Sequence, residues 1–210
     1  MVPVLFARRD SIYKTFRLCD VWDEDRDARN YRGNCPVIAH PPCRGWGRLR
    51  ALANPLPHEK DLALFAVEAV RRCGGVLEHP AGSTLWDAAD LPRPGALDDF
   101  GGYTLPIDQY DFGHRAKKST WLYIVGLPKS DLPDIPIVLG KATHIIGSPG
   151  RRLDGTRLYK GDLGWRPEVT KKEREATPLA FALWLIFVAI QIGLRSDLIK
   201  NLSQQEAKVS

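Results

Sequence analysis

The sequence predicts an α/β fold with a Rossmann-like, mostly parallel sheet flanked by helices. Short apolar runs recur along the chain, and none of them alternates cleanly between apolar and polar residues, as is typical of strands covered on both faces. A helical pattern at 58–75 lies between two of these runs, with acidic residues in its first turn and two glycines at its end. Strand, helix and strand in this order form a βαβ unit, whose right-handed crossover gives a parallel sheet. The expected strands are 2–6, 36–40, 75–79, 121–126 and 142–147.

The length of 210 residues favours one domain with a substantial core. We expect this domain to cover 1–195, with irregular loops at about 91–102 and 147–170, where Pro, Gly and charged residues accumulate. Residues 196–210 are predicted to be a polar C-terminal tail.

The composition indicates a globular protein, with 44% hydrophobic and 26% charged residues. Lys and Arg outnumber Asp and Glu by 30 to 25, which suits a nucleic acid or nucleotide partner, although a solvated basic surface explains it equally well. The four cysteines form no CxxC pair and no signal peptide precedes them. We therefore expect a reduced, cytoplasmic location, in a bacterial or phage-infected host cell.

The most apolar segment is 178–194, in which Gln191 is the single strongly polar residue. It is shorter than the ~20 residues that span a bilayer. We expect a buried helix, or a homodimer interface, rather than a membrane helix.

A thiol follows one of the predicted strands at a rigid turn. In "VIAHPPCRGWGRLR" (37–50) two prolines stop the strand and present Cys43 at the sheet rim, where ligands bind in parallel sheets. Arg44, Arg48 and Arg50 follow, and neighbouring cations lower the pKa of a thiol. The opposing interpretation is that Cys43 is a small buried hydrophobic residue.

A carboxyl group ends the next predicted strand, at Glu78 in "GVLEHP". If the two strands are adjacent, Glu78 and Cys43 face the same crevice, and a partly desolvated carboxyl can stay protonated and donate to a ring nitrogen. A nucleophile with a neutral acid is what addition to the C5=C6 bond of a pyrimidine requires. Glu78 could equally cap the segment after Pro80.

These motifs resemble those of the C5-cytosine DNA methyltransferases, over roughly residues 36–190. "VIAHPPC" is similar to the strand of that family that ends in Pro-Pro-Cys, and "GVLEHP" is similar to its Glu-Asn-Val step. "DFGHRAKKSTWLYIVG" (111–126) resembles the stretch that runs through Gln-x-Arg-x-Arg, and "TPLAFALWL" (177–185) resembles the helix that closes the cofactor pocket. The resemblance implies a reduced methyltransferase-like core, of the compact kind that phages encode.

The resemblance also implies roles for individual residues. Cys43 would attack cytosine C6 and Glu78 would bind cytosine N3. The residues expected to bind the substrate around them are His40, Pro42, Arg44, His79, His114, Arg115, Lys117 and Lys118.

The resemblance implies S-adenosylmethionine as a cofactor, but the sequence after the first strand departs from the pattern of the family. The chain keeps Leu5-Phe6-Ala7, with Phe6 at the expected cofactor site, but Arg8 and Arg9 stand where the family has glycines that let the backbone approach the ligand. Two arginines repel a sulfonium while attracting phosphate. In 20–33 an Asp/Arg-rich loop is predicted to be self-paired, or to contact a ribose through Asp23. No Cys or His spacing fits zinc, so no metal is expected.

Three hypotheses follow. The first is an enzyme that modifies a pyrimidine base of DNA or of a nucleotide, with Cys43 as nucleophile and Glu78 as acid. The second is a catalytically degenerate module that binds nucleotide or nucleic acid through an anion pocket, acting in phage–host defence conflict. The third is a protein that self-associates through its last helix.

Overall fold

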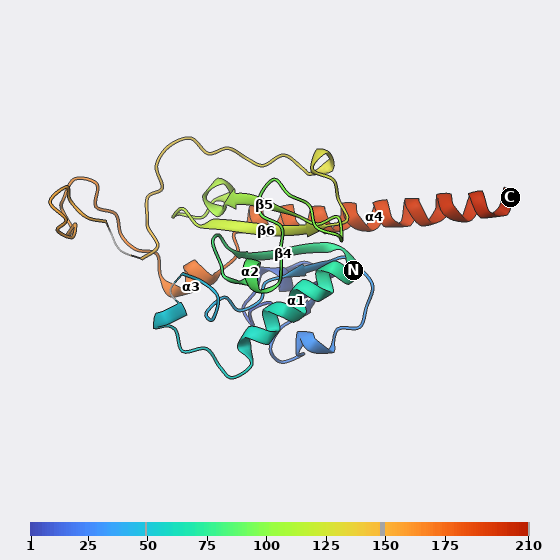
Figure 1. The fold of residues 1–210 in the computed structure, drawn as a ribbon. Coiled ribbons are helices and arrows are strands. Elements are labelled where there is room, and N and C mark those ends of the chain that lie inside the picture. The colour runs from blue at the N-terminus through green and yellow to red at the C-terminus, as the bar shows by residue number, and fades with distance from the viewer. Residues whose placement is uncertain (49, 148–149, 210) are drawn as a thin grey trace.

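The computed structural model describes residues 1–48, 50–147 and 150–209, and it confirms the α/β class: a mostly parallel sheet lies between helices (Figure 1). Six strands are arranged in the order β2-β1-β3-β4-β6-β5. All are parallel except β6, which runs antiparallel to both of its neighbours. The strands are β1 (Val2–Leu5), β2 (Cys19–Trp22), β3 (Val37–Ala39), β4 (Gly75–Pro80), β5 (Tyr103–Asp108) and β6 (Ser119–Val125).

Four of the five predicted strands are confirmed, and the two that were missed lie at the edges of the sheet. β2 and β5 are half-exposed or interrupted by a proline, so neither has the continuous apolar run of a central strand. The predicted strand 142–147 is wrong. It makes only isolated bridges, to Ala116 and Glu168, because it runs within a long irregular segment.

Helix α1 (Glu59–Cys73) covers one face of the sheet and confirms the helix predicted at 58–75. It packs on β3 and β4 with its buried Ala and Val side chains. Gly74, with φ of 74°, ends it. Gly75 then begins β4 so close to β3 that a Cβ there would lie 2.1 Å from the carbonyl oxygen of Val37. Only glycine allows this approach.

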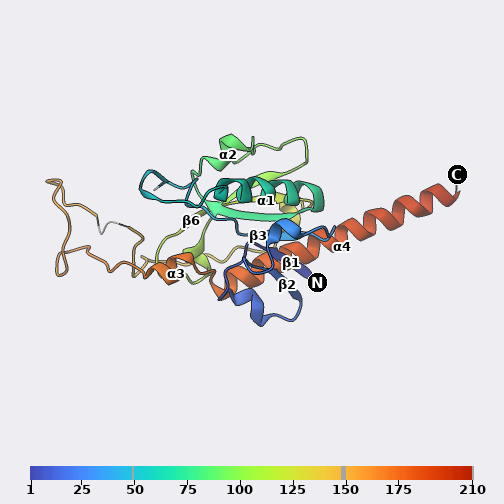
Figure 2. The same cartoon turned by 90° about the horizontal axis from the view of Figure 1, so that it is seen from below.

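Helix α4 (Leu179–Val209) covers the opposite face and projects beyond the sheet (Figure 2). Its buried residues contact the sheet in a continuous core: Phe181, Ala182, Leu185, Ile186, Val188, Ala189 and Ile192. Residues 196–209, predicted to be a polar tail, continue the helix. Residue 210 lies outside the described part of the chain. The exposed side of α4 is also rich in Leu and Ile, and the homodimer interface expected at 178–194 stays a prediction.

The remaining helices are short: α2 (Leu85–Ala88) and α3 (Lys171–Glu175), with five 3-10 turns. The stretch Lys171–Gln205 is long and apolar enough to cross a membrane by length and composition. In this fold 44% of its most apolar window is buried inside the protein, as in the core helix of an α/β domain. The loops expected at 91–102 and 147–170 contain no named helix or strand among their described residues; 148–149 lie outside that part.

The packing of α4 gives the first prediction. Phe181 is fully buried against Phe112, with ring centroids 5.0 Å apart, so Phe181→Ala should lower the free energy of unfolding by about 3–5 kcal/mol. Phe187 on the same helix is 47% exposed, and Phe187→Ala should cost about 1 kcal/mol or less. Urea denaturation of both variants checks this, and equal losses would contradict the placement of the helix.

Candidate functional site

The candidate site lies at the carboxyl ends of β3 and β4. The order of the strands reverses next to it, between β1 and β3. His40 follows β3 directly, and its backbone N–H donates to the carbonyl of Leu5 on β1. After the two prolines the chain turns, and the carbonyl of Cys43 accepts from the N–H groups of Trp46 and Gly47. Within this turn, Cys43 is an exposed residue. Cys43 thus lies in a turn beyond the end of β3, and its role as a nucleophile stays a prediction.

Glu78 is the centre of a hydrogen-bond network on the α4 face of the sheet. One carboxylate oxygen accepts from His40 Nδ1 at 3.1 Å and the other from Gln109 Nε2 at 3.0 Å. The hydroxyl of the buried Tyr13 lies 3.0 Å from His40 Nε2. Because a carboxylate can only accept, Nδ1 carries the hydrogen, and in the neutral ring Nε2 accepts from Tyr13. The carboxylate is therefore fixed in position from two sides.

The charge of Glu78 differs from the prediction. Burial acts to raise its pKa, but the hydrogen bond from His40 and the positive charge of Lys118 outweigh it and lower the pKa to about 2. The expectation of a protonated Glu78 is wrong for the protein without a ligand. At neutral pH this site holds an anion that accepts hydrogen bonds.

The thiol also differs from the prediction. Loss of hydration and the negative charge of Glu78 raise the pKa of Cys43, and Lys118 opposes this only in part. Arg44, next to the thiol in sequence, is paired with Glu59, its Nε lying 3.0 Å from Oε1. The two groups lie at the carboxyl ends of adjacent parallel strands, and the charge of Glu78 acts on Cys43.

The same ion pair anchors the loop that carries the thiol. Glu59 is the first residue of α1 and is 4% exposed. Its carboxylate binds Arg44 on both oxygens and accepts the backbone N–H of Leu56 at 3.2 Å. The Cys43 turn is therefore tied to the first turn of a packed helix.

The other residues predicted to bind a substrate are only partly brought together. His40 lies in the network, and Pro42 is half-buried beside the thiol. His79 does not join them: it follows Glu78 in β4, so it lies on the α1 face, fully buried beside Trp86. Burial lowers the pKa of His79 to about 4, so its ring is neutral at pH 7.

The segment that follows β5 supplies the remaining predicted residues. His114 is buried, and its Nδ1 lies 2.7 Å from the carbonyl oxygen of Ala116. Arg115 pairs with Glu173 of α3, with Nε 2.7 Å from Oε1. Lys117 is exposed, whereas Lys118 is half-buried and acts electrostatically on Glu78 and Cys43. The charge of Lys118 thus acts to lower the pKa of both candidate groups, Cys43 and Glu78.

The residues predicted to bind a cofactor are occupied by other contacts. Phe6 has a left-handed backbone with φ of 58°, as a glycine would at this turn, but its ring packs on Phe65. Arg8 binds Asp10 at 2.9 Å and Glu175 at 2.6 Å. The bridge to Glu175 places a guanidinium between the end of β1 and α3. Two carboxylates thus compensate the charge of Arg8, and binding of S-adenosylmethionine stays a prediction.

The Asp/Arg-rich loop is self-paired, as predicted. Asp23 is buried, and accepts from Lys14 Nζ at 2.6 Å and from the N–H of Asp25 at 3.1 Å. Arg9 pairs with Glu24 and Asp25. Asp23 therefore holds the loop after β2 together, and its contact with a ribose stays a prediction. In the described residues no three His, Cys, Asp or Glu side chains are grouped to hold a metal ion.

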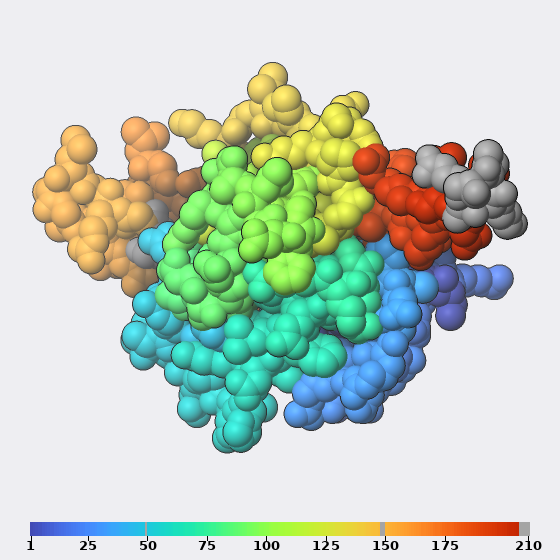
Figure 3. All heavy atoms as spheres, turned by 45° about the vertical axis from the view of Figure 1, so that its right-hand side comes forward, coloured from blue at the N-terminus to red at the C-terminus, as the bar shows by residue number. Residues whose placement is uncertain are grey.

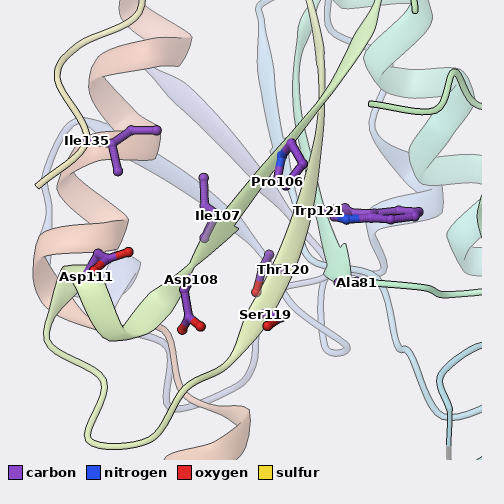
Figure 4. Close-up of a pocket in the computed structure, with 9 residues that line it drawn as sticks. All are labelled: Ala81, Pro106, Ile107, Asp108, Asp111, Ser119, Thr120, Trp121 and Ile135. Atoms are coloured by element: carbon purple, nitrogen blue, oxygen red, sulfur yellow. The ribbon is translucent and has the colours of Figure 1, made fainter. Parts of the chain in front are cut away.

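A hollow of about 420 Å³ lies next to the network, between the ends of β5 and β6 (Figure 4). Thr120 lines it and accepts from Gln109 Nε2 at 3.0 Å, which connects the hollow to Glu78. Neither Cys43 nor Glu78 lines it. The figure shows the oxygens of Asp108, Ser119 and Thr120 near one end and Trp121 across β6 from them.

Sequence reasoning missed three residues of the network, namely Tyr13, Gln109 and Thr120. Gln109 follows β5, a strand that the apolar pattern did not reveal, and Tyr13 belongs to the turn η1 (Ile12–Thr15). Recognition of β5 would have placed Gln109 at the same edge of the sheet as Glu78. Neither a scan against protein-family models nor a search of curated proteins gives a match for this chain.

The lowered pKa of Glu78 predicts an acid dependence of stability. A carboxyl whose pKa falls from 4.5 to about 2 on folding stabilises the protein above pH 4.5, and this contribution is lost as the pH falls towards 2. Wild type should therefore be more stable than Glu78→Gln at pH 6, and the difference should shrink between pH 4.5 and 2. Urea denaturation across this range measures it; a constant difference would contradict the ionised, bonded carboxylate.

Proposed function

We propose that this protein is an enzyme that modifies a pyrimidine base, with Cys43 as the nucleophile and Glu78 as the group that holds the edge of the base. The sheet supports a Rossmann-like assignment, because its order reverses between β1 and β3, as at the switch point of doubly wound folds. Ligands bind at such a point, outside the carboxyl ends of the strands. His40, Cys43 and Glu78 lie there.

The observation that carries the proposal is that an exposed cysteine residue and a fixed carboxylate lie at the carboxyl ends of two adjacent parallel strands. Cys43 is accessible, and the charge of Glu78 acts on it. His40 and Gln109 hold the carboxylate in one orientation. Each carboxylate oxygen has two lone pairs, so both can accept further hydrogen bonds from a ligand.

The ionised carboxylate favours a base with an N–H donor on its edge. The N4 amino group of cytosine and the N3–H of uracil both meet this requirement, and the donor would also offset the negative charge that raises the pKa of the thiol. With its proton lost to water, the Cys43 sulfur would bond to C6 of the ring. The electron pair of the C5=C6 bond would then move to C5 and towards the C4 substituent.

In the minimal reaction the electrophile at C5 is a proton from water. Loss of the original C5 hydrogen then returns an electron pair to the ring, the S–C6 bond breaks, and the thiolate is released. The net result is exchange of the C5 hydrogen with solvent. This outcome needs no cofactor, so it tests the nucleophile separately from any group that the protein transfers.

A module that binds nucleotide or nucleic acid without turnover is the second candidate, and the raised pKa of Cys43 favours it. Its expected anion pocket is only partly available. Arg8, Arg9, Arg44 and Arg115 each pair with a carboxylate, which leaves Lys117 and Lys118. A role in phage–host conflict would belong to this candidate.

The enzymatic proposal predicts exchange of the C5 hydrogen of cytosine or uracil in D₂O, in oligonucleotides or in dCMP and dUMP. Cys43→Ser should reduce the rate to that of buffer, and Glu78→Gln should reduce it by about 100-fold. Because the pKa of the thiol is raised, the rate should rise about tenfold per pH unit from pH 7 to 9, as the thiolate fraction grows. Mass spectrometry of the recovered nucleosides measures the exchange.

Cys35→Ser is the matched control, because Cys35 is also an exposed free cysteine and should leave the rate unchanged. Absence of exchange in wild type, with binding of oligonucleotides or nucleotides that Cys43→Ser retains, would refute the enzyme and support the binding module. Equal exchange in wild type and Cys43→Ser would refute the role of the thiol.

A further inference from the structure

Residues 150–166, which we call the basic arm, stand out from the body of the protein. The arm begins beyond the bridge between Ile145 and Glu168 and projects past α3, at the end opposite to the tip of α4 (Figures 1 and 2). The space-filling view shows it protruding from the body (Figure 3). Backbone hydrogen bonds within the arm shape it. Arg151 and Arg157 form an isolated antiparallel β-bridge, and the backbone N–H of Arg152 donates to the Thr156 carbonyl at 2.7 Å.

The arm is strongly cationic, with five Lys and Arg against two Asp in its 17 residues. Arg152 pairs with Asp162. Arg157 and Lys160 are exposed, and in the described residues no carboxylate lies within ion-pair distance of either. These two charges are therefore available to bind an anion.

The positive charge continues at the base of the arm. A hollow of about 470 Å³ there has three cationic residues in its lining: Lys117, Lys141 and Arg166. Arg166 is held in place by its bond to the Ala142 carbonyl at 2.9 Å. Lys117 directly precedes Lys118, whose charge acts on Cys43 and Glu78. The cations therefore run from the arm to the candidate site.

Apolar side chains are interleaved with these cations. Leu153 and Leu163 are completely exposed, and Tyr159, between Arg157 and Lys160 in sequence, is 64% exposed. Exposed apolar and aromatic groups beside cations are the two elements that bind a polynucleotide, since bases stack on rings while Lys and Arg contact phosphates.

We propose that the basic arm binds the sugar–phosphate backbone of a polynucleotide whose base enters the site at Cys43. A hairpin of this length reaches at most ~28 Å, which covers several phosphates and far exceeds a single nucleotide. The proposal rests on the proposed function for the identity of the polyanion, and it selects nucleic acid over free nucleotide as the substrate class.

The test is fluorescence anisotropy with a labelled 20-nucleotide single strand and with the corresponding duplex, at 50 to 200 mM salt. The double variant Arg157→Gln with Lys160→Gln removes the two charges that have no carboxylate partner. It should weaken binding of whichever form wild type binds more tightly, single strand or duplex, at least about fivefold at 50 mM salt. For a single strand the slope of log K against log salt should decrease by about 1.4, because two phosphate contacts are lost. Excess dCMP should not displace the oligonucleotide.

The matched control is Arg17→Gln with Lys200→Gln, which removes the same charge at exposed positions away from the arm. It should change the affinity by less than about twofold. Equal weakening by both double variants, or absence of oligonucleotide binding by a folded wild type, would overturn the proposal. Binding to anionic phospholipid vesicles that competes fully with the oligonucleotide would also overturn it, in favour of a membrane surface.

The proposal for the arm and the proposed function can be refuted separately. Cys43→Ser should bind the oligonucleotide as tightly as wild type does, which supports the arm whether or not exchange occurs. If the arm variant keeps its affinity while exchange still depends on Cys43, the arm proposal is refuted and the proposed function stands. Circular dichroism verifies that each variant is folded.

Discussion

The negative charge of Glu78, held between His40 and Gln109, is the constraint on which the site depends. Three segments far apart in sequence meet at this carboxylate: the turn after β1, the end of β3 and the start of η4 (Gln109–Phe112). A buried carboxylate is costly unless hydrogen bonds and a cation compensate it. The carboxyl edge of the sheet therefore cannot rearrange without exposing an uncompensated charge, and this gives the crevice a defined shape.

The same charge determines which chemistry is accessible. Together with burial, it raises the pKa of the thiol, and Lys118 opposes this in part. A ligand that brings N–H donors to Glu78 would change both effects together, because it compensates the charge that disfavours the thiolate. Activation of the thiol would then be coupled to occupancy of the site.

The central part of the fold could be predicted from the sequence, whereas the edges could not. Covered strands such as β3 and β4 have continuous apolar runs, and α1 has both periodicity and end signals, so elementary patterns identify them. β2 and β5 pair on one side only and tolerate polar residues or a proline. For α4 the polar sequence after 195 indicated a tail, but a helix that has begun on a core extends at little further cost.

For the site, residue types could be predicted but protonation states could not. Cys43 and Glu78 stood out because each follows a strand at the same edge of the sheet. Their pKa values depend on burial and on partners from distant segments, namely His40 and Lys118 for Glu78, and Glu78 and Lys118 for Cys43. A local pattern contains no information about such partners, so the expected thiolate and neutral acid were both reversed.

The anchoring of the Cys43 turn has a consequence for how a ligand is received. Arg44 joins the turn to Glu59, the first residue of α1, so the backbone that carries the thiol is tied to a packed helix. The thiol is therefore a stationary reference point rather than part of a closing lid. In the proposed reaction the base would therefore have to be brought out to the thiol. The incoming molecule would be distorted, and the protein would not.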